Sequence, residues 1–126
     1  MRKIIFCFVL LMLVFVTLNC FRKENEVPKI KEVMGKFDRG ISQNNVVILD
    51  SVCTKEISPK ILDEIYKQKG FNQPQISERK FFIYEKEAKI SFVLKDQKSD
   101  TIPALPMELL LKKKWGKWRI ESYEMK

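Results

Sequence analysis

The sequence predicts an α+β domain, with N-terminal helices packed on an antiparallel sheet of about four strands, behind an apolar leader. Segments in which apolar residues recur at helical spacing all precede residue 74, and segments that alternate apolar and polar residues all follow it. Helices and strands grouped in this way indicate α+β rather than alternating α/β architecture. A chain of 126 residues has room for one domain, which excludes a multidomain enzyme and a polytopic membrane protein.

The first 19 residues have the pattern of a secretory signal peptide. Arg2 and Lys3 supply positive charge, and Ile4–Leu18 follows as a run of 15 residues in which only Thr17 is polar. At about 1.5 Å per helical residue, this run is shorter than the roughly 30 Å of hydrocarbon that a spanning helix must cross. We therefore expect export of the chain and removal of residues 1–19.

The run ends in Thr17-Leu18-Asn19-Cys20, which resembles the lipobox of bacterial lipoproteins, although Asn19 stands where that box usually has Gly, Ala or Ser. The resemblance implies cleavage before Cys20, acylation of Cys20 and attachment to a membrane. Residues 20–26 then form a polar tether and residues 27–126 the domain. The alternatives are an uncleaved anchor and an ordinary signal peptide.

This resemblance locates the protein in the cell envelope, with the domain in the periplasm or on the cell surface. Phe21 follows the lipobox in place of the Asp that retains some lipoproteins at the inner membrane, which slightly favours the outer membrane. Acylation of Cys20 would leave Cys53 as the one cysteine of the mature chain, whereas without acylation a Cys20–Cys53 disulfide becomes a competing expectation.

Two helices are predicted with start and stop residues, and one segment is ambiguous. One helix is predicted to begin near Glu26, because apolar residues then recur at helical spacing. These residues are Val27, Ile30, Val33, Met34, Phe37 and Ile41. Ser58, followed by Pro59, predicts the start of another helix, with Gly70 as its stop. Between them, the apolar patch Val46–Cys53 fits a helix or a strand.

The remaining sequence predicts a meander of strands. Period-two alternation marks segments around Phe81–Leu94 and Met107–Leu111, with a polar loop at residues 96–100. A two-residue turn at Gly116-Lys117 would close the last hairpin and set Trp115 opposite Trp118. The same register places Ile120 and Ser122 on one face of the last strand and Tyr123 on the other.

This order of elements resembles the nuclear transport factor 2-like superfamily, a cone-shaped α+β roll. Three stretches carry the resemblance: residues 37–42 at the end of the first helix, the compact segment 45–53, and the closing hairpin 109–122. The resemblance implies a curved sheet, a cone interior and pairing of two copies through the sheet. Another small α+β fold, such as one long helix on a meander, is the alternative. The residues expected to line a pocket are aromatic: Phe37, Tyr66, Tyr84, Phe92 and Trp118.

The sequence offers little support for catalysis or for a cofactor. It contains no His, which excludes mechanisms that require imidazole. The resemblance implies that an enzymatic member would place an Asp, a His or a Tyr in the cone as its acid or base. The weak candidate for that role is Asp50, which we interpret as a surface or capping residue. The scattered carboxylates and single mature cysteine predict no metal site, and four Gly form no phosphate loop.

The densest positive charge lies on the closing hairpin, where five basic residues are interleaved with two tryptophans. The basic residues are Lys112, Lys113, Lys114, Lys117 and Arg119. Export argues against nucleic acid as the partner. Two interpretations remain: contact with anionic lipid headgroups, or a solvated strand end without a partner, which is the default. The net charge of +8 owes part of its size to the leader.

The sequence therefore predicts a membrane-anchored, non-catalytic lipoprotein that binds a small apolar ligand or a partner protein. Two other classes stay open. One is a lyase or isomerase that uses a carboxylate in the cone. The other is an envelope assembly scaffold whose cone is filled by side chains such as Phe37, Phe92 and Trp118.

Overall fold

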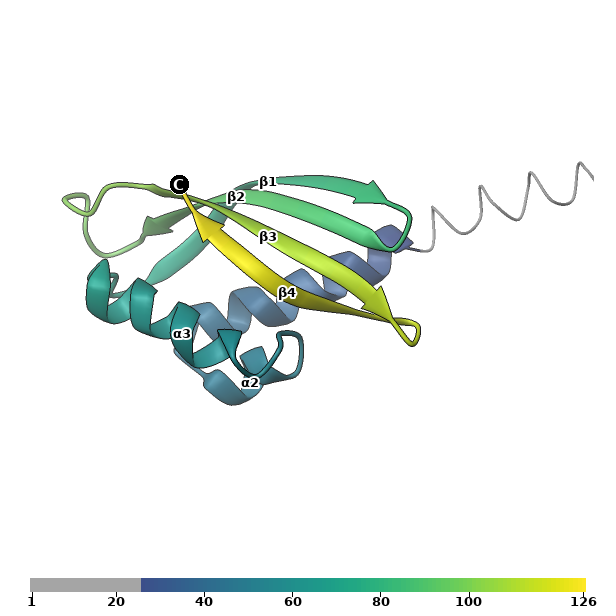
Figure 1. Ribbon diagram of the computed structural model, residues 1–126. Helices are drawn as coiled ribbons and strands as arrows, with labels where there is room; N and C mark the ends of the chain where they lie inside the picture. The colour runs from purple at the N-terminus through teal and green to yellow at the C-terminus, as the bar shows by residue number, and fades with distance from the viewer. Residues whose placement is uncertain (1–25) are drawn as a thin grey trace, which may run out of the picture. The chain divides into compact units, whose positions relative to one another are not determined.

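The computed structural model describes residues 26–126 (Figure 1). The leader, Cys20 and most of the tether lie outside this range. The chain forms two compact units, and the boundary between them lies between Glu32 and Val33. In the first unit, residues 26–32 are helical. The unit Val33–Lys126 begins with helical residues 33–42, followed by α2 (Val46–Asp50), α3 (Ile57–Asp63), the π-helix η1 (Glu64–Gln68), β1 (Pro74–Tyr84), β2 (Glu87–Asp96), β3 (Leu105–Lys114) and β4 (Lys117–Met125).

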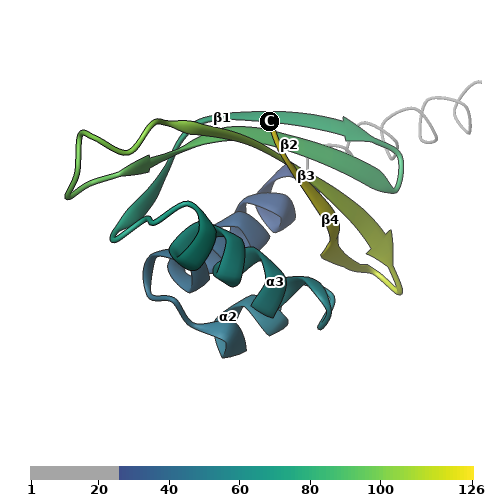
Figure 2. The ribbon, with the colours of Figure 1, turned by 60° about the vertical axis from the view of Figure 1, so that its left-hand side comes forward.

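This unit is α+β, as predicted: helices come first, and a curved four-stranded antiparallel sheet follows in the order β1-β2-β3-β4. The helices cover one face of the sheet (Figures 1 and 2). Alternate residues of β2 and β3 point to that inner face and are buried, which confirms the period-two pattern. They are Ala88, Ile90, Phe92 and Leu94 on β2, and Leu105, Met107, Leu109 and Leu111 on β3.

The helical residues 33–42 bury the predicted stripe, with Met34, Phe37 and Ile41 at most 1% exposed. Gly40 lies on the same side, where Leu49 of α2 packs so closely that a Cβ at Gly40 would be 2.6 Å from Leu49 Cδ2. The helix thus needs a glycine at the point where α2 crosses it.

The ambiguous apolar segment forms α2 because Asn45 caps its first turn. The Asn45 side chain accepts hydrogen bonds from the backbone N–H of Val47 at 3.0 Å and of Ile48 at 3.3 Å. The segment leaves the helix by Cys53, whose backbone forms a parallel bridge with Ile120 of β4. One segment therefore supplies both a helix and a short strand-like contact at the sheet edge.

The next helix begins at Ile57, so the prediction of Ser58 as its N-cap was wrong. Ser58 lies inside the first turn and is fully buried, and Glu56, at the cap position, makes no side-chain cap bond. Gly70 ends the helical stretch as predicted, with a φ of 74°. Its last turn is the π-helix η1, in which the Lys69 N–H donates to the Glu64 carbonyl at 2.9 Å. No sequence pattern predicted this wider turn.

The closing hairpin turns at Trp115-Gly116, one residue earlier than predicted. Both residues have positive φ, 55° and 76°, as a type I′ turn requires, and Gly takes the second central position. Lys114 therefore pairs with Lys117, and Trp118 pairs with Lys113. The predicted Trp115–Trp118 pair does not form, and Trp115 is 100% exposed at the apex.

Two irregularities bend the edge strands. In β1 the register shifts between Ser77 and Lys80, where Glu78 has a φ of 56°. In β4, Leu111 pairs with Ile120 but Leu110 pairs with Ser122, so Glu121 is an extra residue. The extra residue puts Tyr123 on the same inner face as Ile120 and Ser122 on the other, the reverse of the prediction.

Candidate functional site

The space between helices and sheet is occupied by large apolar side chains. Phe37 from the N-terminal helix meets Phe92 of β2 edge to face, with ring centroids 5.9 Å apart and planes at 62°. Phe92 and Trp118 are 2% and 5% exposed. The structure thus brings three of the five predicted pocket aromatics to the inner side of the sheet.

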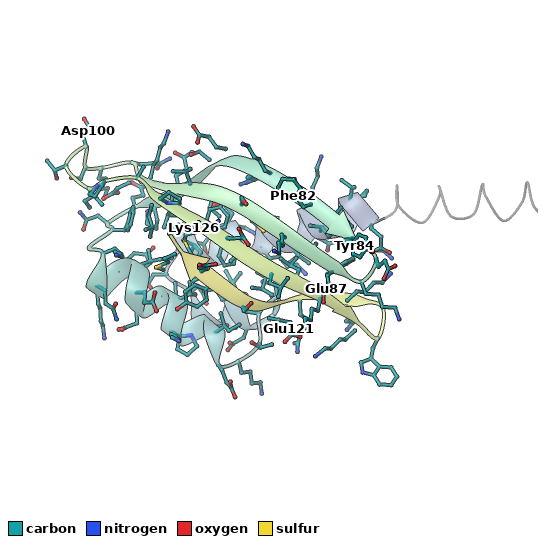
Figure 3. The ribbon with its side chains drawn as sticks, turned by 45° about the horizontal axis from the view of Figure 1, so that its top comes forward. Phe82, Tyr84, Glu87, Asp100, Glu121 and Lys126 are labelled. Atoms are coloured by element: carbon teal, nitrogen blue, oxygen red, sulfur yellow. The ribbon has the colours of Figure 1, made fainter. Side chains whose placement is uncertain are left out.

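The two predicted tyrosines lie elsewhere. The Tyr66 hydroxyl, on η1, donates to the carbonyl of Ile41, and burial raises the pKa of this phenol. Tyr66 therefore ties η1 to the end of the N-terminal helix. Tyr84 points to the outer face at the end of β1, where it is 75% exposed, so it is separated from the interior by the sheet (Figure 3).

Asp50 lies at the end of α2, beside the only cysteine among the described residues, Cys53. One Asp50 carboxylate oxygen and the Ser58 hydroxyl are buried without a hydrogen bond of normal geometry. Burial raises the pKa of the Cys53 thiol to about 12, and nearby Ser58 offsets part of that rise. A neutral, buried thiol is a poor nucleophile, and complete burial also removes Cys53 from reach of a surface disulfide partner.

One carboxylate that meets the inner side of the sheet is Glu64, which no sequence pattern had marked. Glu64 opens η1, and its Oε1 accepts a hydrogen bond of 2.7 Å from the Tyr123 hydroxyl on β4. Burial and the adjacent carboxylate raise the pKa of Tyr123 well above its usual range. Neither partner carried a detectable signal, because the π-turn orients Glu64 and the β4 irregularity turns Tyr123 inward.

The predicted basic residues do share one hairpin. Lys114 lies opposite Lys117, and Lys112 lies opposite Arg119, so two like-charged pairs face each other across β3 and β4. Opposite charges offset part of this repulsion: Lys114 Nζ is 3.2 Å from Glu121 Oε1, and Lys112 lies opposite Glu87 on β2. The hairpin tip itself, residues 112–119, contains no acidic residue.

The outer face of the sheet carries exposed aromatic residues on its edge strand. Phe82 and Tyr84 of β1 are 61% and 75% exposed and point the same way, near Glu87 of the neighbouring strand (Figure 3). At the opposite edge, the segment around Cys53 pairs with β4: the Ile120 N–H donates to the Val52 carbonyl at 2.8 Å. The β4 edge of the sheet is therefore covered by the segment around Cys53, whereas the β1 edge strand exposes two aromatic side chains on the outer face.

Residues 26–126 contain neither a metal-binding cluster nor a membrane-spanning helix. No group of three or more Cys, Asp or Glu side chains in this part of the chain is arranged to hold a metal ion. Within the same range, no helix is both long enough and apolar enough to cross a bilayer. The predicted lipidation at Cys20 falls outside the described residues.

Comparison with known proteins supports the fold. No protein-family model matches the sequence, and no curated protein matches it. Among solved structures, the chain is similar to a nuclear transport factor 2-like protein of unknown function from Shewanella baltica OS155. The TM-score is 0.61, over 81% of this chain and 94% of that one, with 16% sequence identity. At that identity, the likeness confirms the predicted fold and carries no function.

Proposed function

We propose that the protein is an envelope lipoprotein, anchored through Cys20, whose domain binds a partner protein and performs no catalysis. The observation that carries the binding role is the exposed pair Phe82 and Tyr84 on the outer face of β1. Exposed aromatic residues that lie together supply large contact area at low entropic cost, and they are enriched where proteins associate. The anchor rests on the leader and on the resemblance of residues 17–20 to a lipobox.

The internal side chains favour a partner protein over a small apolar ligand. Phe37, Phe92 and Trp118 are buried between helices and sheet, and two of them contact each other. Side chains that pack in this way stabilise the domain and leave the outer face as the surface for recognition. Binding of an apolar ligand inside the cone is the alternative, and it predicts a rise in melting temperature with added ligand.

A catalytic role would use Glu64 with Tyr123 rather than Asp50. The two side chains form a carboxylate–phenol pair on the inner side of the sheet. Their hydrogen bond, however, supports a structural function equally well, because it joins η1 to β4. We therefore place the pair among the contacts that hold the helices on the sheet.

The partner surface is tested by photo-crosslinking in cells that make the protein. A benzophenone side chain replaces Phe82 in one variant and the exposed Lys60 of α3 in a matched control. Adducts with a second protein, or with a second copy, are expected from position 82 and not from position 60. Equal adducts from both positions, or none from position 82, would contradict the proposed surface.

The anchor is tested separately by mass and location. The mature protein should begin at Cys20 and carry the mass of two or three acyl chains, and Cys20→Ser should abolish both the added mass and membrane attachment. An unchanged mass and location in Cys20→Ser would overturn the anchor and leave the crosslinking result intact.

A further inference from the structure

We propose that the tip of the β3–β4 hairpin, residues 112–119, docks on a membrane surface of anionic lipids. The inference rests on the proposed anchor, since it assigns the orientation of a domain already held at a bilayer. It goes beyond that anchor by naming the surface, the lipid charge and the side chain that enters the headgroup region.

The first observation is Trp115, whose fully exposed side chain buries no surface within the domain although its backbone conformation is unfavourable for a bulky residue. Its side chain is 100% exposed, while its backbone has a φ of 55°, a left-handed conformation that bulky residues rarely adopt and that Asn or Gly would adopt with less strain. A residue that breaks a local rule without a gain inside the fold points to a gain outside it. Tryptophan is the side chain enriched at membrane interfaces, because its ring is amphipathic.

The second observation is the arrangement of charge beneath that tryptophan. Two like-charged cross-strand pairs, Lys114 with Lys117 and Lys112 with Arg119, lie in the two outward-facing rows nearest the turn. Like charges placed directly opposite destabilise a sheet. Anionic headgroups would relieve the part of this repulsion that Glu87 and Glu121 do not offset, and the four basic residues in these two rows match a surface of phosphates rather than a single anion.

The third observation is the reach of the chain. Residues 20–25 can add at most about 3.5 Å each, and the helical residues 26–32 add about 1.5 Å each, so Cys20 and Val33 are separated by no more than roughly 30 Å. A domain held within that distance meets the bilayer at high effective concentration, so a hairpin with modest intrinsic affinity would remain docked.

The test reads Trp115 directly in the full chain, reconstituted into vesicles of zwitterionic phosphatidylcholine or of phosphatidylcholine with phosphatidylglycerol. Brominated acyl chains quench an indole that reaches the headgroup boundary. We expect quenching in the anionic vesicles, little in the zwitterionic ones, and reversal by high salt. Trp118 is buried and serves as the unquenched internal reference.

Two variants separate docking from folding. Trp115→Asn should remove the quenching and raise the melting temperature, because Asn fits the left-handed position. Lys114→Gln with Lys117→Gln should lower the ratio of docked to undocked protein about 30-fold, from the contribution of two basic residues near a charged surface. The matched control, Lys55→Gln with Lys60→Gln, removes the same charge from the exposed helical side and should leave the ratio unchanged.

Three outcomes would overturn the proposal. They are a Trp115 that stays unquenched in anionic vesicles, an equal loss of docking in the control pair, and an emission shift with a DNA oligonucleotide or polyglutamate but not with vesicles. None of these results bears on the anchor, which the mass at Cys20 decides. Conversely, the absence of acyl chains on Cys20 would overturn the anchor, but quenching of Trp115 would still show whether the hairpin tip reaches the bilayer.

Discussion

Replacing Gly40 by Ala should destabilise the domain, although alanine is the better helix former. A Cβ at this position would lie 2.6 Å from Leu49 Cδ2, 2.7 Å from Leu49 Cγ and 3.3 Å from the Leu49 backbone N. Carbon atoms normally approach to about 3.5–4.0 Å, so the overlap is close to 1 Å. Leu49 is fully buried, and its backbone is also in the way, so α2 itself must move.

Two opposing terms set the magnitude. Overpacking a core of native density costs about 1–3 kcal/mol, and replacing a helical Gly by Ala gains up to about 1 kcal/mol. We expect a net loss of about 1–2 kcal/mol, which lowers the melting temperature of a domain this size by roughly 5–15 °C. Urea denaturation and thermal melting, both followed by circular dichroism, measure the two quantities.

The same helix supplies the matched control. A Cβ at Gly35 would meet no atom within 4 Å beyond its own helix backbone, so Gly35→Ala should keep only the helix-propensity gain and raise stability by up to about 1 kcal/mol. In addition, Leu49→Ala should cost less in the Gly40→Ala background than in the wild type, because it removes the clash. The reasoning is refuted if Gly40→Ala stabilises the domain as Gly35→Ala does.

Three further predictions concern titratable groups. Tyr123→Phe should lower the free energy of unfolding by about 1 kcal/mol in urea denaturation at pH 7, because Glu64 loses its hydrogen-bond donor. Because the pKa of Tyr123 is raised in the folded protein, the stability of the wild type should also fall as pH rises above 10, and the stability of the variant should fall less. A wild type that keeps its stability from pH 10 upward would contradict the assignment. Cys53, with its pKa near 12, should resist a thiol reagent at pH 8 in the folded protein and react in urea, whereas rapid labelling of the native state would show that the thiol is accessible. Burial of the Asp96 carboxylate would raise its pKa, but hydrogen bonds from the backbone N–H groups of Asn72, Gln73 and Lys98 outweigh burial and hold the pKa below the ordinary 3.8. Asp96→Asn should therefore destabilise the domain at pH 7, and the difference in unfolding free energy between wild type and variant should narrow below pH 4. A difference that stays constant with pH would show that the negative charge of Asp96 does not stabilise the domain.

Sequence patterns predicted the fold well where a repeating period decides which side is buried. The stripe through Met34, Phe37 and Ile41 and the alternation in β2 each follow from burial of one face, and both are confirmed. The aromatic pair Phe37–Phe92 joins two such faces, so both residues were identifiable as inward-pointing from their spacing.

The errors arose at single residues that interrupt a period. One extra residue at Glu121 reversed the faces of everything after it in β4, and a one-residue displacement of the turn separated Trp115 from Trp118. The π-turn that orients Glu64 has no sequence pattern, since it depends on how the helix end packs. The carboxylate–phenol pair therefore could not be predicted, because two such irregularities create it.

The two proposed surfaces constrain each other geometrically. The β1–β2 and β3–β4 turns lie at one end of the sheet, and the loop that carries Asp100 lies at the other (Figures 1 and 3). With the β3–β4 tip on the bilayer, a strand of 10 residues at about 3.3 Å per residue would hold that loop roughly 30 Å from the membrane. The strands would then run away from the membrane, and the outer face with Phe82 would point sideways, where a partner that is itself membrane-bound could reach it. Loss of Trp115 should consequently reduce crosslinking from position 82 only for such a partner, whereas a soluble partner would be captured in either orientation.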